Sequence, residues 1–394
     1  MSNKLSQIIV QKYGGATLAT PEKIKIAAER IHRLRNSGAK IVVVVSAMGQ
    51  TTNDLISLAN KISSRPPLRE LDMLLSTGER ISMSLLSMAL NEIGCPAISF
   101  TGSQAGILTD DLHVNANIVE IKSFRVEQAL EENKVVILAG FQGVSATTKE
   151  ITTLGRGGSD ITAVAMAGYL KADRCEILKD VDSIYTADPK LVPQAKPIRK
   201  LTYPQLLDMT SWGAKVLNYR SVKLASEKNV TLYVGPAHEG DSTGTLITNA
   251  NAFFQQQPIA LNSFSKVIRI NLKNNFKNFE QFQNYLHDNN VGEVLLLKNQ
   301  DQKYFISGAD ENLQALLQFS TQKKDFEIET QSLSSVSLTY ALSQPIAAPE
   351  ALFTTIPANN FGIELSFQGS QSVHFILKSE KRSDLVNFLH TLCH

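Results

Sequence analysis

A continuous run of β-branched residues, Ile41–Val45, constrains the fold more than any other feature of this sequence. A strand that is apolar on both faces is typical of a parallel sheet with helices packed on both sides. Further short apolar runs occur up to about Thr248, separated mostly by helical patterns such as Pro21–Asn36 with Thr20 as its N-cap. These runs are Ile8–Gln11, Ala97–Phe100, Val135–Ala139, Glu176–Leu178 and Thr231–Val234. The alternation predicts a layered α/β domain with a mostly parallel sheet.

The pattern changes near Asn249, where the polar stretch NANAFFQQQP begins. We interpret residues 1–248 as the α/β domain, residues 249–262 as a linker and residues 263–394 as a smaller α+β region. In this last region, strand-like and helical segments follow one another as two small β-α-β-β-α units. A single irregular α+β domain also fits the pattern.

The composition is that of an ordinary globular protein. Hydrophobic residues make up 43% and charged residues 19% of the 394 residues, which is enough apolar material for a sizeable core. A formal net charge of +2 gives no field that would attract nucleic acid or a membrane surface. The three cysteines lack metal-type or disulfide-type spacing, and no apolar run approaches membrane-spanning length. We therefore expect a cytoplasmic protein with no nucleic-acid or membrane partner.

Two glycine-rich turns follow predicted strands, and each carries a cation. Lys12 precedes a Gly-Gly pair at the end of the first strand, and Arg156 lies within the segment Gly155–Asp160, just before a helical run. Glycines let backbone amides approach an anion, lysine offers a point charge for phosphate, and arginine binds a carboxylate with two hydrogen bonds. A plain tight turn and a helix capped by Ser159 or Asp160 are the structural alternatives.

Acidic residues accompany these turns. Glu79 opens an apolar helical segment, while Asp180, Asp182 and Asp188 follow another predicted strand. Glu79 can bind an ammonium group and the aspartates can help to place magnesium, although helix charges and turn caps are their ordinary roles. The sequence contains no GxxxxGK[ST] segment, zinc-type cluster or GxSxG segment. Because open α/β sheets bind ligands at strand ends, the sequence predicts a site there.

A series of segments in this order resembles the motifs of aspartate kinases over residues 8–248. The segments are VQKYGGAT, VVVVSAMGQTTNDL, LLSTGERIS, SFTGSQAGILTDD, LAGFQGV, TTLGRGGSDITAVAMA, ILKDVDSIYTADPKLVPQA and SWGAKVLNYRSVKLA. The resemblance implies the three-layer amino-acid-kinase fold. It also implies ATP-dependent phosphorylation of the side-chain carboxylate of L-aspartate to 4-phospho-L-aspartate, with Mg²⁺, as the first step toward lysine, threonine and methionine. The tail is similar to paired, ferredoxin-like ACT domains, which implies a homodimer assembled through the C-terminal region.

The same resemblance implies a role for individual residues. Lys12, Asp160 and Lys215 are expected to be catalytic, with the aspartate orienting the two lysines. The residues expected to bind L-aspartate are Thr17, Thr52, Glu79, Arg156 and Ser159, with Arg156 on the α-carboxylate and Glu79 on the α-amine. The residues expected to bind ATP are Lys12, Gly14, Gly15, Lys179, Asp180, Tyr185, Lys190 and Lys215. Metal ligands are left unassigned.

Several positions depart from the family pattern. Lys179 stands where the family usually has threonine, and Ser183 replaces a glycine, which is costly if φ there is positive. Asn218-Tyr219 replaces a common His-Pro, and Lys190 replaces a common arginine. The tail also lacks the glycines of an effector loop, so we expect weak control by lysine, threonine or methionine. A kinase of another acidic amino acid and a non-catalytic ligand-binding paralogue remain the alternatives.

Overall fold

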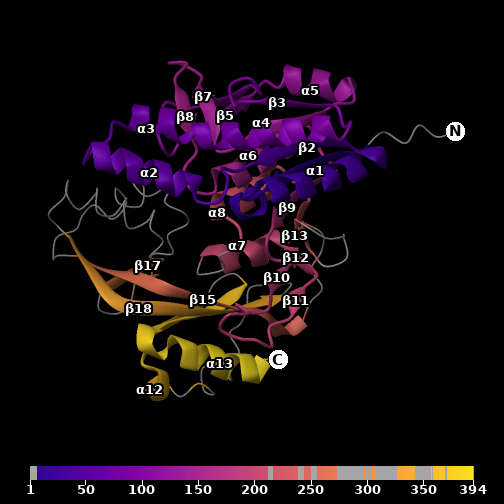
Figure 1. The fold of residues 1–394 in the computed structure, drawn as a ribbon. Coiled ribbons are helices and arrows are strands. Elements are labelled where there is room, and N and C mark those ends of the chain that lie inside the picture. The colour runs from indigo at the N-terminus through magenta and orange to yellow at the C-terminus, as the bar shows by residue number, and fades with distance from the viewer. Residues whose placement is uncertain are drawn as a thin grey trace. The chain divides into compact units, whose positions relative to one another are not determined.

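The computed structural model describes residues 7–211, 216–237, 244–249, 255–272, 297–298, 303–307, 326–341, 356, 358–368 and 371–393. The chain forms two compact units (Figure 1). The first comprises Met1–Ile184 and Arg220–Asn249, and the second comprises Tyr185–Tyr219 and Ala250–His394. Within the described ranges, no helix combines the length and the apolar character needed to cross a bilayer.

A mostly parallel sheet forms the centre of the first unit. Its strands are β1 (Ile8–Tyr13), β2 (Lys40–Val45), β3 (Ala97–Phe100), β6 (Val135–Ala139), β9 (Arg174–Lys179), β13 (Leu232–Pro236) and β14 (Thr245–Thr248). They lie in the order β14-β13-β9-β1-β2-β6-β3, and the β13–β14 pair is antiparallel. The β-branched run of β2 lies between β1 and β6 and is buried on both faces, as its sequence predicted.

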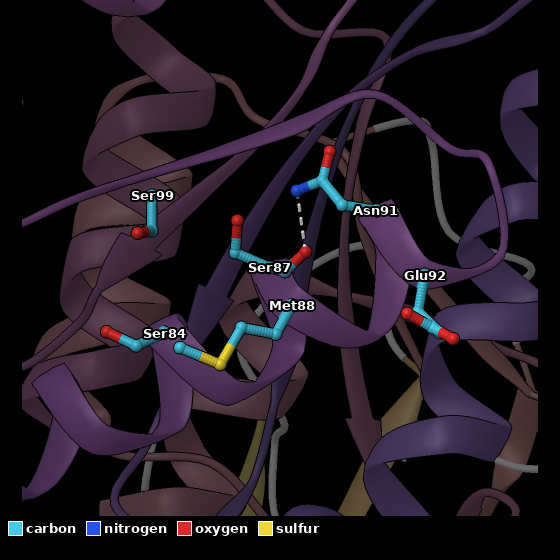
Figure 2. A pocket seen from close by; sticks show the side chains of 6 residues that line it. All are labelled: Ser84, Ser87, Met88, Asn91, Glu92 and Ser99. Carbon is cyan, nitrogen blue, oxygen red and sulfur yellow. Dashed lines mark hydrogen bonds between the residues drawn. The ribbon is translucent and has the colours of Figure 1, made fainter.

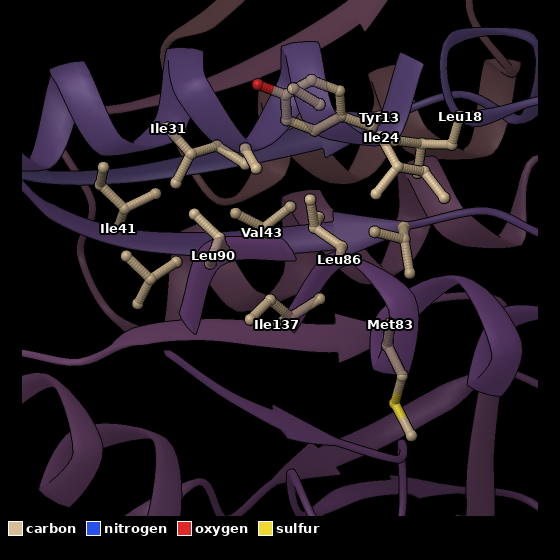
Figure 3. Packing of buried hydrophobic residues seen from close by; sticks show 14 of the residues in the cluster. Tyr13, Leu18, Ile24, Ile31, Ile41, Val43, Met83, Leu86, Leu90 and Ile137 are labelled. Carbon is tan, nitrogen blue, oxygen red and sulfur yellow. The ribbon is translucent and has the colours of Figure 1, made fainter. Parts of the chain in front are cut away.

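Helices cover both faces of this sheet. The helices of the first unit are α1 (Pro21–Asn36), α2 (Thr51–Ile62), α3 (Leu68–Leu75), α4 (Thr77–Glu92), α5 (Phe124–Glu131), α6 (Gly158–Tyr169) and α8 (Tyr219–Glu227). As predicted, α1 begins after Thr20, whose side chain accepts a hydrogen bond from the Lys23 N–H group at 3.4 Å. Figure 3 shows Ile31 of α1 and Leu90 of α4 beside Val43 of β2, all in one buried cluster.

The opposite face of the sheet belongs to α6. Val44 points away from the cluster that contains Val43, because neighbouring side chains on a strand alternate between faces. A β-carbon added to Gly140 would lie 2.9 Å both from Val44 Cγ1 and from Ser159 Cβ at the start of α6. The predicted three-layer α/β fold is therefore confirmed for this unit.

A second, 4-stranded sheet in the first unit was not predicted from the sequence. Its order is β5-β4-β7-β8, formed by Ile118–Ile121, Ile107–Thr109, Gln142–Ser145 and Ile151–Thr153. It carries two connections, residues 110–117 between β4 and β5, and residues 154–157 between β8 and α6. These two connections contact each other beside the candidate active site.

The second unit contains a 6-stranded sheet in the order β16-β17-β15-β18-β20-β19. These strands are β15 (Gln255–Leu272), β16 (Leu297–Lys298), β17 (Lys303–Ser307), β18 (Phe326–Ala341), β19 (Ile363–Gln368) and β20 (Ser372–Lys378). The unit also includes α7 (Tyr203–Ser211), α12 (Ala358–Phe361), α13 (Arg382–Cys393), η2 (Ser379–Lys381) and the short strands β10 (Ile184–Tyr185), β11 (Pro197–Ile198) and β12 (Lys200–Thr202). The strands of both predicted tail units thus join one sheet, which agrees with the predicted smaller α+β, ACT-like region.

One strand of the tail begins earlier than the sequence suggested. Residues 249–262 were interpreted as a linker, yet β15 already begins at Gln255. Ala260 and Leu261 are buried and lie opposite Thr339 and Leu338 of β18, so apolar burial extends the strand into the polar stretch. The predicted domain limits themselves stay predictions.

Candidate active site

Lys12 and Asp160 form a buried ion pair at the end of the central sheet. Lys12 lies near the end of β1, and Asp160 lies in the first turn of α6, which packs on β1. The Lys12 Nζ atom is 2.7 Å from Asp160 Oδ1, and the two side chains are only 10% and 9% exposed. A charge buried this deeply needs a partner, so each side chain fixes the position of the other.

The turn after β1 brings backbone groups close to this lysine. The N–H group of Gly14 donates to the Leu178 carbonyl oxygen at 3.3 Å. A β-carbon on Gly15 would lie 2.6 Å from the Ala47 carbonyl oxygen, so only glycine allows this close approach of the two turns. The Thr17 hydroxyl donates to the Gly14 carbonyl oxygen at 2.7 Å and thereby supports the turn. The predicted contact of Thr17 with a substrate stays a prediction.

Glu79 presents a buried carboxylate with one unpaired oxygen atom. The side chain, 3% exposed, lies in the first turn of α4, and Oε1 accepts a hydrogen bond from the Ala47 N–H group at 3.1 Å. Among the described residues, no donor reaches the buried Oε2 atom. Burial raises the pKa of Glu79 to about 7, against the opposing effects of the Ala47 hydrogen bond and the positive charge of Lys12. A buried, unsatisfied carboxylate with a perturbed pKa is typical of a ligand-binding site.

Arg156 lies in the loop between β8 and α6, where glycines adopt backbone angles that other residues disfavour. Gly155 and Gly157 have φ values of +74° and +72°. A β-carbon on Gly155 would also lie 2.8 Å from Asn115 Oδ1. Gly157 is the N-cap of α6 and no side chain caps the helix, so the capping role considered for Ser159 or Asp160 is wrong. The loop places Arg156 at the surface, two residues before the buried Ser159.

Two charged residues that the sequence analysis missed, the buried Asp72 and the partly buried Arg220, hold this loop. Asp72 of α3 is fully buried and accepts hydrogen bonds from His113 Nδ1 at 2.6 Å, the Val114 N–H group at 3.1 Å and Thr153 Oγ1 at 2.5 Å. Burial raises the pKa of Asp72, while its hydrogen bonds oppose that shift. The acidic Asp72 among the apolar residues at the end of LRELDMLL was the signal available in the sequence.

Arg220 of α8 holds the same region from another helix. Its guanidinium group donates to Asn115 Oδ1 at 2.9 Å, the Leu154 carbonyl oxygen at 2.8 Å, the Ala116 carbonyl oxygen at 3.2 Å and Asn117 Oδ1 at 3.1 Å. These acceptors belong to residues 110–117 and to the connection 154–157 that carries Arg156. The position of an arginine two residues after VLN gave no sign of this role.

Lys179 adds a second positive charge near the ion pair. It ends β9, and its backbone carbonyl accepts from the Ala237 N–H group at 2.9 Å. Burial lowers the pKa of Lys179, Asp160 opposes this effect, and the positive charge of Lys12 adds to it. Asp180 follows at the surface. The neighbouring Ser183, which replaces a family glycine, is not among the positive-φ residues of the described chain, so the strain considered for it does not occur.

The structure does not place all the predicted site residues together. Thr52 lies half-buried in the first turn of α2. Tyr185 and Lys190 belong to the second unit, and Lys215 lies outside the described residues. The described ranges also contain no group of three or more histidine, cysteine or acidic residues that would hold a metal ion.

A pocket on the outer side of α4 contains none of the predicted site residues. It is lined by Ser84, Ser87, Met88, Asn91, Glu92 and Ser99 (Figure 2). Figure 2 shows Asn91 donating to the backbone carbonyl of Ser87, one turn earlier on the same helix. Apart from the apolar Met88 and the acidic Glu92, the lining is polar and uncharged, which is not the charge pattern that binds phosphate.

Comparison with known proteins gives the family. The model of the amino acid kinase family matches residues 7–236. An aspartokinase of Corynebacterium glutamicum is 51% identical over 243 residues, which cover 62% of this chain and 58% of that protein. The chain therefore spans less than two thirds of the length of this curated relative.

Two solved structures extend the likeness to the tail. Escherichia coli aspartokinase III in complex with aspartate and ADP matches 98% of this chain and 99% of its own, with a TM-score of 0.81 at 23% identity, which shows a common fold. An aspartate kinase of Synechocystis matches 98% of this chain and 69% of its own, with a TM-score of 0.56 at 32% identity. The chain belongs to the amino acid kinase family, and within that family it is similar to the aspartate kinases.

Proposed function

We propose that this chain catalyses the transfer of the γ-phosphoryl group of ATP to the β-carboxylate of L-aspartate, giving 4-phospho-L-aspartate. The observation that carries the proposal is the unpaired Oε2 atom of Glu79, held near the buried Lys12–Asp160 pair at the ends of adjacent parallel strands. The amino-acid-kinase match covers this part of the chain, and the Corynebacterium relative is named an aspartokinase.

Glu79 gives the site its preference for an amino acid. An ammonium group at Oε2 would supply the missing hydrogen-bond donor and stabilise the ionised carboxylate, whose burial is otherwise unfavourable. Arg156 would bind the α-carboxylate, and the hydroxyl groups of Thr52 and Ser159 would add polar contacts. These interactions fix the α-carbon and leave the side-chain carboxylate free to face ATP.

The remaining groups serve phosphoryl transfer. The β-carboxylate of aspartate is ionised at neutral pH, so the reaction needs no strong general base. It needs alignment of the reacting groups and stabilisation of negative charge on the transferred group. Lys12, held by Asp160, supplies a fixed positive charge. The glycine turn would supply backbone N–H groups other than that of Gly14, which already donates to the Leu178 carbonyl oxygen. Lys215 is proposed as the second lysine.

The proposed nucleotide site includes Lys179, Asp180, Tyr185 and Lys190. Mg²⁺ usually keeps several water ligands and is held by one or two carboxylates together with substrate phosphates. The exposed Asp180, next to Lys179 at the end of β9, fits such a limited role. When bound, the ion would neutralise charge on the ATP phosphates.

The wider biological role is proposed from family likeness. The product would enter the route to lysine, threonine and methionine, in the cytoplasm. The second unit would assemble a homodimer, in keeping with the resemblance of the tail to ACT domains.

Aspartate and glutamate distinguish this proposal from a general acidic-amino-acid kinase. With the α-carbon fixed by Glu79 and Arg156, one extra methylene would move the acceptor carboxylate out of line with the γ-phosphate. We expect kcat/KM for aspartate to exceed that for glutamate by about 100-fold or more. The measurement is ADP release in a coupled assay at pH 8 with each acid in turn. Equal kcat/KM values for the two acids would reject aspartate as the substrate that the site selects.

A further inference from the structure

We propose that Arg220 and Asp72 are positioning residues that set the affinity for aspartate by holding the loop that carries Arg156. The proposal rests on the proposed function, in which Arg156 binds the substrate α-carboxylate. Neither residue belongs to the site predicted from the sequence. Both are charged groups directed at the same pair of connections, from different helices.

Arg220 joins the two connections directly. One of its nitrogen atoms, Nη1, donates both to Asn115 Oδ1 at 2.9 Å and to the Leu154 carbonyl oxygen at 2.8 Å. Nη2 donates to the Ala116 carbonyl oxygen and to Asn117 Oδ1. The residue after Leu154 is Gly155, which precedes Arg156. The guanidinium group therefore links the start of the Arg156 loop to residues 115–117.

Asp72 holds residues that directly precede those held by Arg220. Its carboxylate accepts a hydrogen bond from the N–H group of Val114 at 3.1 Å. Val114 has a φ value of +69°, a conformation that a β-branched residue rarely adopts. It also accepts the Thr153 hydroxyl at the end of β8. One fully buried carboxylate thus stabilises an unfavourable backbone conformation and ties it to the strand that leads into the Arg156 loop.

Close packing transmits this arrangement to Gly155. There is no room for a β-carbon at Gly155, because Asn115 Oδ1 and the Val114 carbonyl oxygen would lie 2.8 Å and 3.1 Å from it. Asn115 is also a hydrogen-bond partner of Arg220. The backbone of the Arg156 loop therefore rests on residues that Asp72 and Arg220 fix. A loop fixed before binding loses less conformational entropy when the substrate binds.

A double-mutant cycle between Arg220 and Arg156 tests the proposal in the full-length chain. We expect Arg156→Gln to raise the KM for aspartate about 100-fold and Arg220→Met to raise it about tenfold. In both variants kcat and the KM for ATP should stay within about twofold of the parent values. In the Arg156→Gln background, Arg220→Met should raise the aspartate KM less than twofold further, because Arg220 acts through Arg156.

Each outcome bears on a different claim. If Arg156→Gln raises the KM but the effect of Arg220→Met is fully additive, or absent, the positioning role is wrong while the proposed function stands. If Arg156→Gln leaves the aspartate KM unchanged, the assignment of Arg156 is wrong and this inference fails with it. A purely structural Arg220 would lower the melting temperature without separating the aspartate KM from kcat and the ATP KM.

Two further variants guard against misfolding and against non-specific effects. The lysine of Arg220→Lys reaches fewer of the four acceptors, so the aspartate KM of this variant should lie between those of the parent and of Arg220→Met. A KM equal to that of Arg220→Met in a folded protein also supports the need for a guanidinium group. A parent-like KM contradicts that need. Arg35→Met is the matched control, since Arg35 lies on α1 and donates twice to the carbonyl oxygen of Asn133, which lies between α5 and β6. Arg35→Met should leave the aspartate KM unchanged, and a rise equal to that of Arg220→Met would overturn the proposal.

Thr153→Val tests the role of Asp72 by removing one of the hydrogen-bond donors to its carboxylate. We expect a rise of about threefold in the aspartate KM. No rise would exclude Asp72 from the positioning role.

Discussion

Replacement of Lys12 by methionine should lower kcat by on the order of 100-fold or more, with little change in the KM for aspartate. Lys12 lies in a buried site where its charge is held 2.7 Å from Asp160. Its attraction for the phosphoryl group grows as negative charge spreads over that group during transfer, so the loss should appear in turnover. The comparison is best made at pH 8, where Glu79, with its pKa of about 7, is mostly ionised.

Stability must be separated from catalysis in this experiment. Lys12→Met leaves the buried Asp160 without its partner, which typically costs about 3 kcal/mol or more in the free energy of unfolding. The double variant Lys12→Met/Asp160→Asn removes both charges and should recover much of that stability without recovering turnover. Near-parent kcat in a folded Lys12→Met protein would show that the lysine has no role in the chemistry.

Replacement of Glu79 by glutamine should weaken substrate binding and stabilise the protein at the same time. The amide keeps an oxygen for the Ala47 N–H group but loses the charge that attracts an ammonium group, so we expect the aspartate KM to rise about 100-fold. At pH 8 the free energy of unfolding should rise by about 2–3 kcal/mol, because the variant no longer buries a negative charge that has a hydrogen-bond donor at only one of its two oxygen atoms.

The pH dependence of stability follows from the raised pKa. The pKa of Glu79 is about 7 in the folded protein against an ordinary value of 4.5, so between these pH values the folded state holds a proton that the unfolded state has lost. The contribution of Glu79 to stability is therefore fully present below pH 4.5 and is lost as the pH rises through 7. The advantage of Glu79→Gln should accordingly be large at pH 8 and small at pH 5.

Urea unfolding at these two pH values, together with aspartate titrations, measures both effects. Glu92→Gln is a suitable control, since Glu92 is exposed on the same helix and should change neither quantity. A parent-like aspartate KM in Glu79→Gln would remove the central residue of the proposed amino-acid site. A variant no more stable than the parent at pH 8 would show instead that the Glu79 charge has another partner.

The elements of the central sheet could be predicted because they depend on local patterns. The run Ile41–Val45 forms a strand that is buried on both faces, and a helix begins at Thr20 and Pro21. Both features could be predicted because strand burial and helix capping depend on residues that are close together in the sequence. The small sheet escaped prediction because β4 and β8 have only 3 residues each, too few for a periodic signal. The early start of β15 depends on pairing with β18, which lies far along the chain.

In the candidate site, too, features that depend on local sequence could be predicted, and those that depend on contacts between distant residues could not. The glycines around Arg156 and the resemblance to aspartate kinases pointed to the loop, and its positive φ values explain why glycine is needed there. The unpaired oxygen atom of Glu79 required a structure, because it depends on what surrounds the carboxylate. Asp72 and Arg220 were missed because their partners at residues 113–117 and 153–154 are distant in sequence. Hydrogen bonds of this kind leave no periodic pattern.

Direct identification of the product tests the central claim most clearly. The enzyme is incubated with ATP, Mg²⁺ and L-aspartate at pH 8, and hydroxylamine is added to trap any acyl phosphate as a hydroxamate. We expect the β-hydroxamate of aspartate to form in an amount equal to the ADP released, and to be absent when aspartate is omitted or Lys12→Met is used. Release of ADP without an aspartate hydroxamate, or no dependence on aspartate at all, would contradict the assignment of this chain as an aspartate kinase.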